Sequence, residues 1–206
     1  ALGLAIGTTG PHSFAKEAQD FVHDIRGLEE FQGWDSQIPN EVTLNLYSTQ
    51  RRRVTLNDPG WGAFGIDGFT EGRLALGTYL TGANVGTLIR FGWNLPLDFA
   101  DARLSVTAYS HQPFTSSRTE RSSWSLYGVV GALGSVVAHN ITLDGPVFRN
   151  FDTGTSSEPL VGELYAGFGV RYRRWNFSYV HTYRSKEFKG QDDAPSFGSL
   201  TLSYRL

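Results

Sequence analysis

Apolar and polar side chains alternate with a period of two along most of this sequence. Near the C-terminus, Leu200, Leu202, Tyr204 and Leu206 lie on one face of an extended segment, and the residues between them are polar. Such alternation predicts a β-strand with one apolar and one polar face. With the apolar run that begins at Leu2, we count about eight such strands. The other alternating segments are 42–46, 73–80, 85–94, 124–138, 160–172 and 175–184.

Two architectures contain many strands of this kind: a soluble β-sandwich with its apolar face inside, and a membrane β-barrel with that face toward lipid. Several segments run about 11 to 15 residues, more than the roughly 5 to 6 of a soluble strand and enough for a tilted membrane strand. Aromatic residues gather toward strand ends, and charges lie at mid-strand on the polar faces. The pattern therefore favours an all-β, antiparallel outer-membrane barrel. The mid-strand charges are Arg90, Glu163, Arg171 and Arg184.

The connections differ in length in a way that agrees with a barrel. Segments 139–157 and 9–38 are long, whereas 54–61 is short and 173–174 predicts a tight hairpin. If the last strand ends at the periplasmic face, counting backward places the long segments outside the cell, as barrels prefer. The long segment 95–123 would fall on the periplasmic side, so it holds either a missed pair of short strands or one large excursion.

Composition excludes several classes of function. The 18 basic and 20 acidic residues nearly balance, which leaves no basic footprint for nucleic acid. Cysteine is absent, so neither a disulfide framework nor a thiolate metal site or nucleophile is available. No apolar run is long enough for a transmembrane helix. Because the chain starts inside the apolar run ALGLAIG without methionine, we expect further residues before Ala1.

One segment breaks the alternation. Residues 13–27, SFAKEAQDFVHDIRG, predict a short amphipathic helix with Ser13 as N-cap and Gly27 as C-terminal stop. In an extracellular loop, such a helix is expected to lie along the barrel wall with its apolar stripe in the outer leaflet. Gln19 and His23, four residues apart, would then face the barrel, where a histidine is well placed to act on a lipid head group. The alternative is an ordinary solvated histidine. The apolar stripe comprises Phe14, Ala18, Phe21, Val22 and Ile25.

The order of motifs resembles that of the lipid A 3′-O-deacylase (LpxR-like) family of outer-membrane barrels. The similarity starts in GTTGPHSFAKEAQDFVHDIRGLEEFQGWDSQIPNE and continues through RFGWNLPLDF, ITLDGPVF, LVGELYAGF, YRSKEFKGQ and FGSLTLSYRL, so it covers essentially the whole chain. The matching positions of the first motif are Gly10, Pro11, Ser13, Gln19, His23, Gly33, Trp34, Gln37, Asn40 and Glu41.

The resemblance implies a barrel of twelve strands that uses calcium to hydrolyse the 3′-linked acyloxyacyl ester of lipid A in the outer leaflet of the bacterial outer membrane. Residues 1–206 would be one barrel domain that holds the C-terminal eight of those strands, with 13–27 as a loop helix. The family's first four strands carry its Glu-Asn-Asp motif and much of the calcium site, and nothing here matches them. The other calcium ligands are therefore expected before Ala1, and activity depends on them.

The resemblance also assigns roles to individual residues. His23 matches the catalytic histidine and is expected to act as general base, because imidazole accepts protons near neutral pH. Glu29 matches a functional glutamate, which would orient His23 or bind Ca²⁺, and a slip of one residue would transfer that role to Glu30. Gln19 is expected to bind substrate or position His23, or to be plain helix surface. Trp34 would line an acyl groove or anchor the chain at the membrane interface.

Other polar residues have a structural interpretation first. Ser13 is a helix cap rather than a nucleophile, Asp144 with Gly145 indicates turn chemistry, and 51–53 is expected at a periplasmic strand end. Three residues match a family motif but are expected to pair inside the barrel: Arg184, Glu187 and Gln191. Two competing functions remain at this point: a passive pore or structural barrel, and a soluble carbohydrate-binding sandwich.

Overall fold

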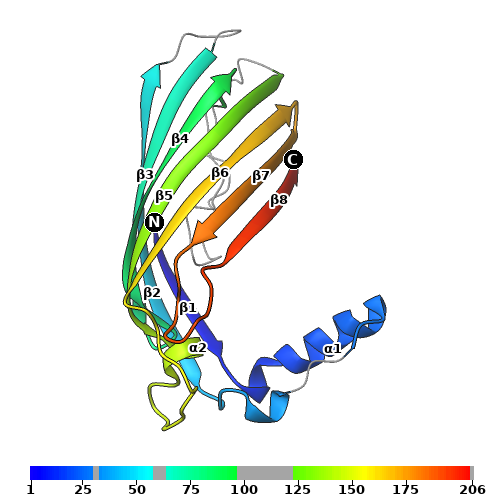
Figure 1. Ribbon diagram of the computed structural model, residues 1–206, viewed down its shortest axis with the longest axis vertical. Coiled ribbons are helices and arrows are strands. Elements are labelled where there is room, and N and C mark those ends of the chain that lie inside the picture. The colour runs from blue at the N-terminus through cyan, green and yellow to red at the C-terminus, as the bar shows by residue number, and fades with distance from the viewer. Residues whose placement is uncertain (30–32, 58–63, 97–122, 205–206) are drawn as a thin grey trace.

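The computed structural model describes residues 1–29, 33–57, 64–96 and 123–204. In this part of the chain, eight antiparallel strands form one sheet in the order of the sequence (Figure 1). The sheet is strongly curved, as expected for a barrel wall, and β1 and β8 are its two edges. The strands are β1 (Leu2–Thr8), β2 (Val42–Asn57), β3 (Phe64–Gly77), β4 (Leu80–Trp93), β5 (Trp124–Asn140), β6 (Leu160–Tyr172), β7 (Trp175–Arg184) and β8 (Ser196–Tyr204).

The helices occupy one end of the sheet. A 3-10 turn η1 (Pro11–Ser13) precedes α1 (Ala15–Arg26), and a second turn η2 (Trp34–Ser36) follows it before β2 begins. The short helix α2 (Ile141–Asp144) continues directly from β5 at the same end. Among the described helices, none has the length and apolar character needed to cross a bilayer.

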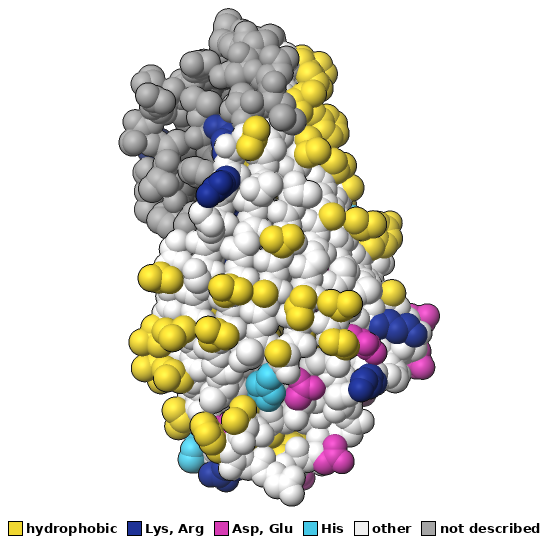
Figure 2. Space-filling model, turned by 90° about the vertical axis from the view of Figure 1, so that its left-hand side faces the viewer, with side chains coloured by type: hydrophobic (Ala, Val, Ile, Leu, Met, Phe, Trp, Pro, Cys, Tyr) yellow, Lys and Arg dark blue, Asp and Glu magenta, His cyan; other side chains and the backbone are white. Residues whose placement is uncertain are grey.

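The predicted alternation separates two faces of the sheet. On β3, Glu71 and Arg73 are buried on the concave side, whereas Leu74 and Leu76 are exposed on the convex side. Rows of apolar side chains cover part of this convex face (Figure 2). The prediction that Leu80 continues the strand through 73–80 is wrong, because the chain reverses after Gly77 and Leu80 begins β4.

Aromatic side chains collect at the end of the sheet opposite the helices. The rings of Phe64 and Trp93, on paired positions of β3 and β4, meet edge to face with centroids 5.2 Å apart. Trp175 and Tyr204 also pair across β7 and β8, with tilted rings and centroids 4.8 Å apart. This confirms the expected aromatic positions near strand ends, where a membrane barrel places its interfacial girdle.

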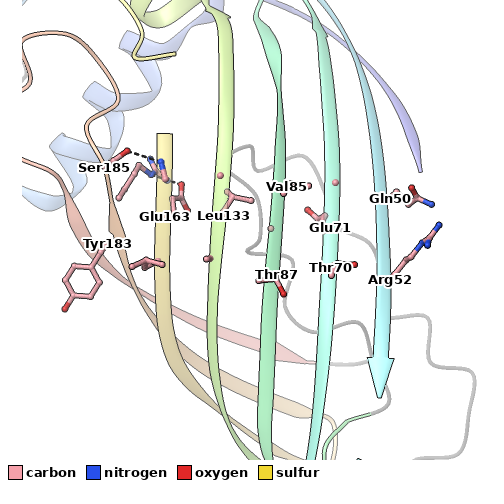
Figure 3. A pocket seen from close by; sticks show the side chains of 17 residues that line it. Gln50, Arg52, Thr70, Glu71, Val85, Thr87, Leu133, Glu163, Tyr183 and Ser185 are labelled. Atoms are coloured by element: carbon pink, nitrogen blue, oxygen red, sulfur yellow. Dashed lines mark hydrogen bonds and ion pairs between the residues drawn. The ribbon is translucent and has the colours of Figure 1, made fainter. Parts of the chain in front are cut away.

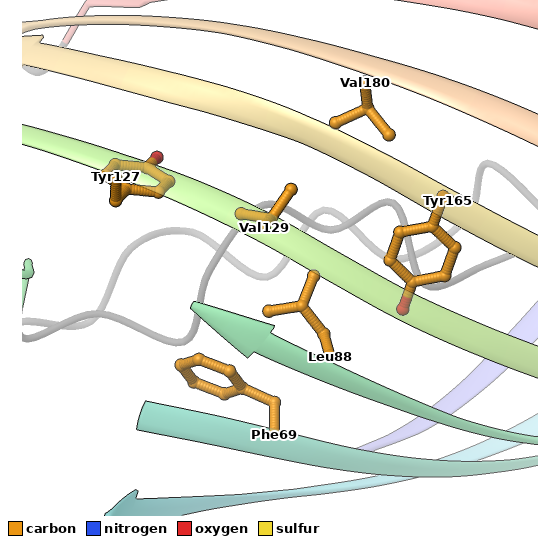
Figure 4. Packing of buried hydrophobic residues seen from close by; sticks show 6 residues of the cluster. All are labelled: Phe69, Leu88, Tyr127, Val129, Tyr165 and Val180. Atoms are coloured by element: carbon orange, nitrogen blue, oxygen red, sulfur yellow. The ribbon is translucent and has the colours of Figure 1, made fainter. Parts of the chain in front are cut away.

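The concave face is filled by paired charges and packed apolar groups. Arg90 is fully buried, and its Nε and Nη2 donate to the two oxygens of Asp67 at 2.9 and 2.7 Å. Arg53 contacts the same carboxylate at 2.8 Å, and Arg51 pairs with Glu71. Residues 51–53 therefore lie within β2, not at a strand end as predicted, because β2 extends to Asn57. An apolar cluster lies beside these pairs (Figure 4): Phe69, Leu88, Tyr127, Val129, Tyr165 and Val180.

The connections fall on the two ends as expected. The long connections β1–β2 and β5–β6 leave from the end that carries α1 and α2, and the Arg173–Arg174 hairpin lies at the other end (Figure 1). Half of the predicted short connection 54–61 is corrected, since 54–57 belongs to β2, and residues 58–61 lie outside the described part of the chain. The question of strands within 95–123 concerns residues that lie largely outside the described part of the chain.

A shallow groove crosses the convex face from β2 to β7 (Figure 3). Gln50 and Arg52 lie at its β2 end, and Tyr183 and Ser185 lie at its β7 end. Between them the floor is built from small residues, including Gly134 and Gly162, beside which an added Cβ would meet open space. The groove belongs to the convex wall and is distinct from the loop end that carries the predicted site.

Candidate functional site

Backbone geometry at the end of β1 sets where the helix begins. Gly10 has φ +72°, and a Cβ at this position would approach the Asn40 nitrogen to 2.5 Å, so only glycine fits. The side chain of Asn40 accepts a hydrogen bond from the His12 amide at 2.8 Å, which ties η1 to the start of β2. These contacts give the glycine and asparagine of the motif a structural explanation.

The predicted start of the helix is corrected by one residue. Phe14, in a left-handed conformation with φ 54°, is the N-cap of α1, and the Ser13 hydroxyl donates instead to the Gly10 carbonyl at 2.7 Å. The end of the helix is confirmed at Gly27, whose φ of 61° allows the left-handed C-cap that terminates many helices. Serine thus closes the turn before the helix rather than the helix itself.

Helix α1 does not lie along the described strands. None of its residues is buried, and it runs away from the end of the sheet (Figure 1). Phe21 and Ile25, on the predicted apolar stripe, are exposed. The expectation that the helix packs along the barrel wall is therefore wrong for the described wall, because the stripe meets no strand there. The prediction that this segment forms an amphipathic helix is confirmed.

His23 and Glu29 are brought together at the C-terminal end of α1. The His23 Nδ1 lies 2.5 Å from the backbone carbonyl oxygen of Glu29. Since a carbonyl only accepts hydrogen bonds, Nδ1 must carry the proton in this contact, and the lone pair of the neutral ring is then on Nε2. The amide of Leu28 donates to the His23 carbonyl at 3.0 Å, which turns the chain so that Glu29 returns to the imidazole.

The other two predicted residues lie closer to the base of the helix. Gln19 is half-buried and precedes His23 by one helical turn on the same face. Trp34 lies in η2 and lines a cavity at the base of α1 together with Ser13, Ile38 and Phe151. The structure thus pairs His23 with Glu29 and places Trp34 in a separate cavity.

A carboxylate that matches the family motif, but to which the sequence analysis assigned no role, joins the two long loops. Glu41 is 6% exposed, and its two side-chain oxygens accept hydrogen bonds from the amides of Val147 and Phe148, each at 3.0 Å. The sequence signal for this role was the position of Glu41 directly before the alternating residues of β2. A charged side chain buried at the start of a strand needs hydrogen-bond partners, because burying it without them is costly. Glu41 therefore fastens the β5–β6 loop to the base of the α1 loop.

Asp144 closes the second loop, as its predicted turn role suggests. Its carboxylate accepts hydrogen bonds from the Ser157 amide at 2.7 Å, the Ser157 hydroxyl at 2.5 Å and the Asn140 amide at 2.8 Å. Partial burial by itself would raise the pKa of Asp144, but the hydrogen bonds from Ser157 and Asn140 outweigh it and hold the pKa below its ordinary value.

The charged motif near the end of β7 is a paired network, which the sequence analysis anticipated. Arg184 contacts Glu163 at 2.7 Å and Glu187 at 2.8 Å. The Gln191 side chain accepts a hydrogen bond from the Glu187 amide at 2.7 Å. These contacts order the β7–β8 loop. They explain the presence of Arg184, Glu187 and Gln191 by structure alone, so no catalytic role is needed for them.

The donor set for the expected metal is small. Among the described residues, no group of three or more histidine and acidic side chains is arranged to hold a metal ion. Glu29 is exposed and contributes a single carboxylate, whereas Ca²⁺ takes six to eight oxygen ligands. The described residues therefore do not form a calcium site by themselves.

Comparison with known proteins decides the family. A family model described as "Outer membrane protein LpxR" matches residues 1–206. The chain belongs to the LpxR family. Among solved structures, LpxR from Salmonella typhimurium is similar, with a TM-score of 0.76 and 20% sequence identity. The match covers 100% of this chain and 66% of the Salmonella chain. A search of curated proteins finds no match.

Membership of the LpxR family confirms two predictions: the family resemblance drawn from the motifs, and the outer-membrane barrel fold. The protein is located in the outer membrane. The soluble sandwich is excluded, since the apolar convex face of the LpxR-family wall faces lipid rather than a core. The long loops of this chain leave from the end that carries α1 and α2, and outer-membrane barrels usually carry their longer loops on the extracellular side.

Proposed function

We propose that this LpxR-family protein is an outer-membrane hydrolase that removes the 3′-linked acyloxyacyl chain from lipid A, with His23 as general base. The observation that supports the proposal is the contact between His23 Nδ1 and the Glu29 carbonyl. It holds the ring in the tautomer whose Nε2 accepts a proton, and it does so on an amphipathic helix at the extracellular end.

The reaction is direct hydrolysis by water. Nε2 of His23 takes a proton from a water molecule while the water oxygen attacks the ester carbonyl carbon. The tetrahedral intermediate then expels the sugar oxygen at position 3′, which receives the proton held on His23, and the acyloxyacyl group leaves as a carboxylic acid. Imidazole suits both steps because its ordinary pKa lies near neutral pH.

The remaining predicted residues serve the substrate in this proposal. Gln19 lies one turn before His23, so its amide can hold the ester or an adjacent amide group of lipid A. The exposed apolar stripe of α1 enters the outer leaflet beside the acyl chains, which keeps His23 at the depth of the head group. Trp34 contacts the substrate from the cavity at the base of the helix.

Calcium remains part of the proposal, with Glu29 as one carboxylate ligand. A cation beside the ester would polarise its carbonyl and stabilise the developing negative charge. The Glu29 carbonyl and carboxylate would then have separate tasks, the first toward His23 and the second toward the ion. Removing calcium is the direct test of this component.

A passive pore is the competing function, and the filled interior argues against it. Fully buried Arg90 and Asp67 pair across neighbouring strands, and the apolar cluster around Phe69 packs on the same concave face. Buried ion pairs and packed apolar groups on the concave face are unlike the hydrated polar wall of a wide channel.

The test is mass spectrometry of lipid A from cells that express the full-length protein. Loss of the 3′-linked acyloxyacyl group is expected with the unaltered protein, and it should disappear with His23→Ala and after chelation of calcium. His12→Ala is the matched control, because His12 is an exposed histidine of the same loop. Unchanged lipid A from a correctly folded barrel would refute the deacylase, and activity that survives His23→Ala would refute the assigned base.

A further inference from the structure

The groove on the convex wall follows the register of the strands (Figure 3). Arg52 on β2 pairs with Thr70 on β3, and this row of paired residues continues strand by strand to Tyr183 on β7. A second outward-facing row runs beside it from Gln50 to Gly162. At about 4.8 Å between neighbouring strands, the groove is straight and about 24 Å long. The first row is Arg52, Thr70, Thr87, Ala132, Leu164 and Tyr183.

Differences in side-chain size turn these two rows into a groove. The second row holds Gly72, Gly134 and Gly162, and an added Cβ would meet open space at the last two. The rows on either side carry larger apolar side chains that are exposed on the same face, so they form two apolar edges above the floor. These side chains are Leu74, Val136 and Leu160 on one side, and Val54, Ile89 and Val130 on the other.

The charge in the groove comes from Arg52. Its neighbours Arg51 and Arg53 are paired on the concave side of the sheet. Glu71 and Glu163, whose backbone contributes to the floor, also pair with arginines on that side. Arg52 itself is exposed on the convex face, and it makes no ion pair or hydrogen bond with a residue that the structure describes. One end of the groove therefore presents a guanidinium to an anion.

The groove runs obliquely to the membrane. Arg52 lies in the second half of β2, toward the end of the sheet opposite α1, whereas Tyr183 lies next to the end of β7 at the side of the long loops. Barrel strands tilt by about 40°, so a row of about 24 Å across them changes depth by about 15 Å. This is about half of the roughly 30 Å hydrocarbon core, the depth of one leaflet.

These features define the chemistry of an occupant. It must be long, narrow and apolar to lie between the two edges, and it must carry an anion at the Arg52 end. Guanidinium groups bind phosphate through paired N–H donors. A charged side chain on the lipid face of a barrel is destabilising, and a bound phosphate would offset that cost. A phospholipid combines the phosphate with an acyl chain of the required shape.

The position of Arg52 favours one leaflet. Outer-membrane barrels usually carry their longer loops outside the cell, which puts the Arg52 end of the groove in the periplasmic half of the membrane. Lipid A lies in the outer leaflet, so its phosphates would be at the Tyr183 end, away from the cation. A lipid of the periplasmic leaflet has its phosphate at the correct end, and its chain then extends toward Tyr183.

We propose that the convex groove binds one phospholipid of the periplasmic leaflet, with its phosphate on Arg52 and one acyl chain along the floor toward Tyr183. The site shares no residue with the contact between His23 and Glu29, so it does not depend on the proposed hydrolase activity. The lipid is held in place rather than exchanging freely as the bulk bilayer does. It should therefore remain on the protein after extraction into detergent.

The first test is native mass spectrometry of the full-length protein purified in detergent. The unaltered protein should carry one phospholipid, identified by its mass. Arg52→Gln removes the cation, and Gly134→Val fills the floor where a Cβ meets open space, so both should lose the lipid. Two controls should retain it. Arg174→Gln removes an exposed charge outside the groove, and Leu126→Phe adds bulk to the convex face of the same strand.

The second test separates the phosphate from the chain. Delipidated protein is titrated with phosphatidylglycerol and with diacylglycerol of the same chains, which lacks the phosphate. Arg52→Gln should raise the Kd for phosphatidylglycerol by about 10-fold, the effect of one lost charged contact, and leave the Kd for diacylglycerol unchanged. Gly134→Val should weaken both. Copurified lipopolysaccharide in place of phospholipid, no retained lipid, or equal retention by all five proteins would refute the site.

Discussion

The imidazole of His23 is held by the backbone of Glu29 and not by its carboxylate, with 2.5 Å between Nδ1 and the carbonyl oxygen. Any residue at position 29 offers a carbonyl, so the orientation of His23 depends on the path of the chain between them. That path turns at Gly27, whose left-handed conformation ends α1. The glycine and the histidine are thus linked through a backbone hydrogen bond.

This relationship predicts which substitutions disturb the histidine. Glu29→Ala should leave the proton of the neutral His23 ring on Nδ1, whereas Gly27→Val should shift it, because a β-branched residue resists the left-handed region. The tautomer is read from ¹⁵N chemical shifts of labelled histidine. A change of tautomer in Glu29→Ala would show that the carboxylate, not the carbonyl, positions the ring.

The buried carboxylate of Glu41 predicts a local loss of stability. Glu41→Ala leaves the amides of Val147 and Phe148 without their acceptors, which should cost about 1 to 3 kcal/mol at this buried site. Hydrogen exchange of those two amides should accelerate while exchange within β5 stays slow. Glu41→Gln, which keeps one acceptor oxygen, should have an intermediate effect, and equal protection in all three proteins would contradict the clamp.

The low pKa of Asp144 predicts that acid opens the β5–β6 loop. The pKa of Asp144 is lower in the folded protein than in the unfolded chain. Ionised Asp144 therefore stabilises the loop at pH values above the ordinary aspartate pKa of about 3.9. This stabilisation is lost as pH falls through the lower folded value. Pepsin, which is active in acid, should begin to cleave within residues 145–157 as pH falls through this range.

Asp144→Asn is the control for the acid effect. Its amide cannot reproduce all the hydrogen bonds accepted from Ser157 and Asn140, so the loop should be open at every pH and its cleavage should lose the pH dependence. Cleavage of the unaltered loop that does not vary with pH would rule out Asp144 as the group responsible.

The strands and their faces could be predicted from the sequence because alternation is local. The reversal after Gly77 could not, since Leu74, Leu76 and Leu80 continue the alternation through the turn. The turn is held by a residue outside the segment. The side chain of Asn45, on the neighbouring strand β2, accepts a hydrogen bond from the Tyr79 amide at 2.8 Å. A pattern along one segment carries no record of such a partner.

The same limit applies to the candidate site. His23 and Glu29 could be proposed because they lie six residues apart in one motif, but the sequence did not reveal that the contact uses the carbonyl. That detail depends on the left-handed backbone at Gly27. Glu41 and Val147 are separated by 106 positions, so only the fold brings them together. Trp34 was predicted as a lining residue, whereas the cavity around it needs the second loop.

Two glycines on β5 predict opposite outcomes for the same substitution. Gly131 lies on the concave face directly opposite Tyr165, whose ring covers it, so Gly131→Ala forces the ring away. The Tyr165 hydroxyl donates to the Thr87 carbonyl at 2.8 Å, and displacement would break this bond inside the apolar cluster. We expect a loss of about 1 to 3 kcal/mol, measured by urea unfolding in detergent.

Gly134, three residues later, lies on the convex face and a Cβ there meets open space. Gly134→Ala should therefore leave stability unchanged or raise it slightly, since alanine reduces the freedom of the unfolded chain. The comparison isolates the effect of the ring, because both changes add one methyl group to the same strand. Equal destabilisation by the two substitutions would mean that β5 needs glycine for its backbone rather than for the packing of Tyr165.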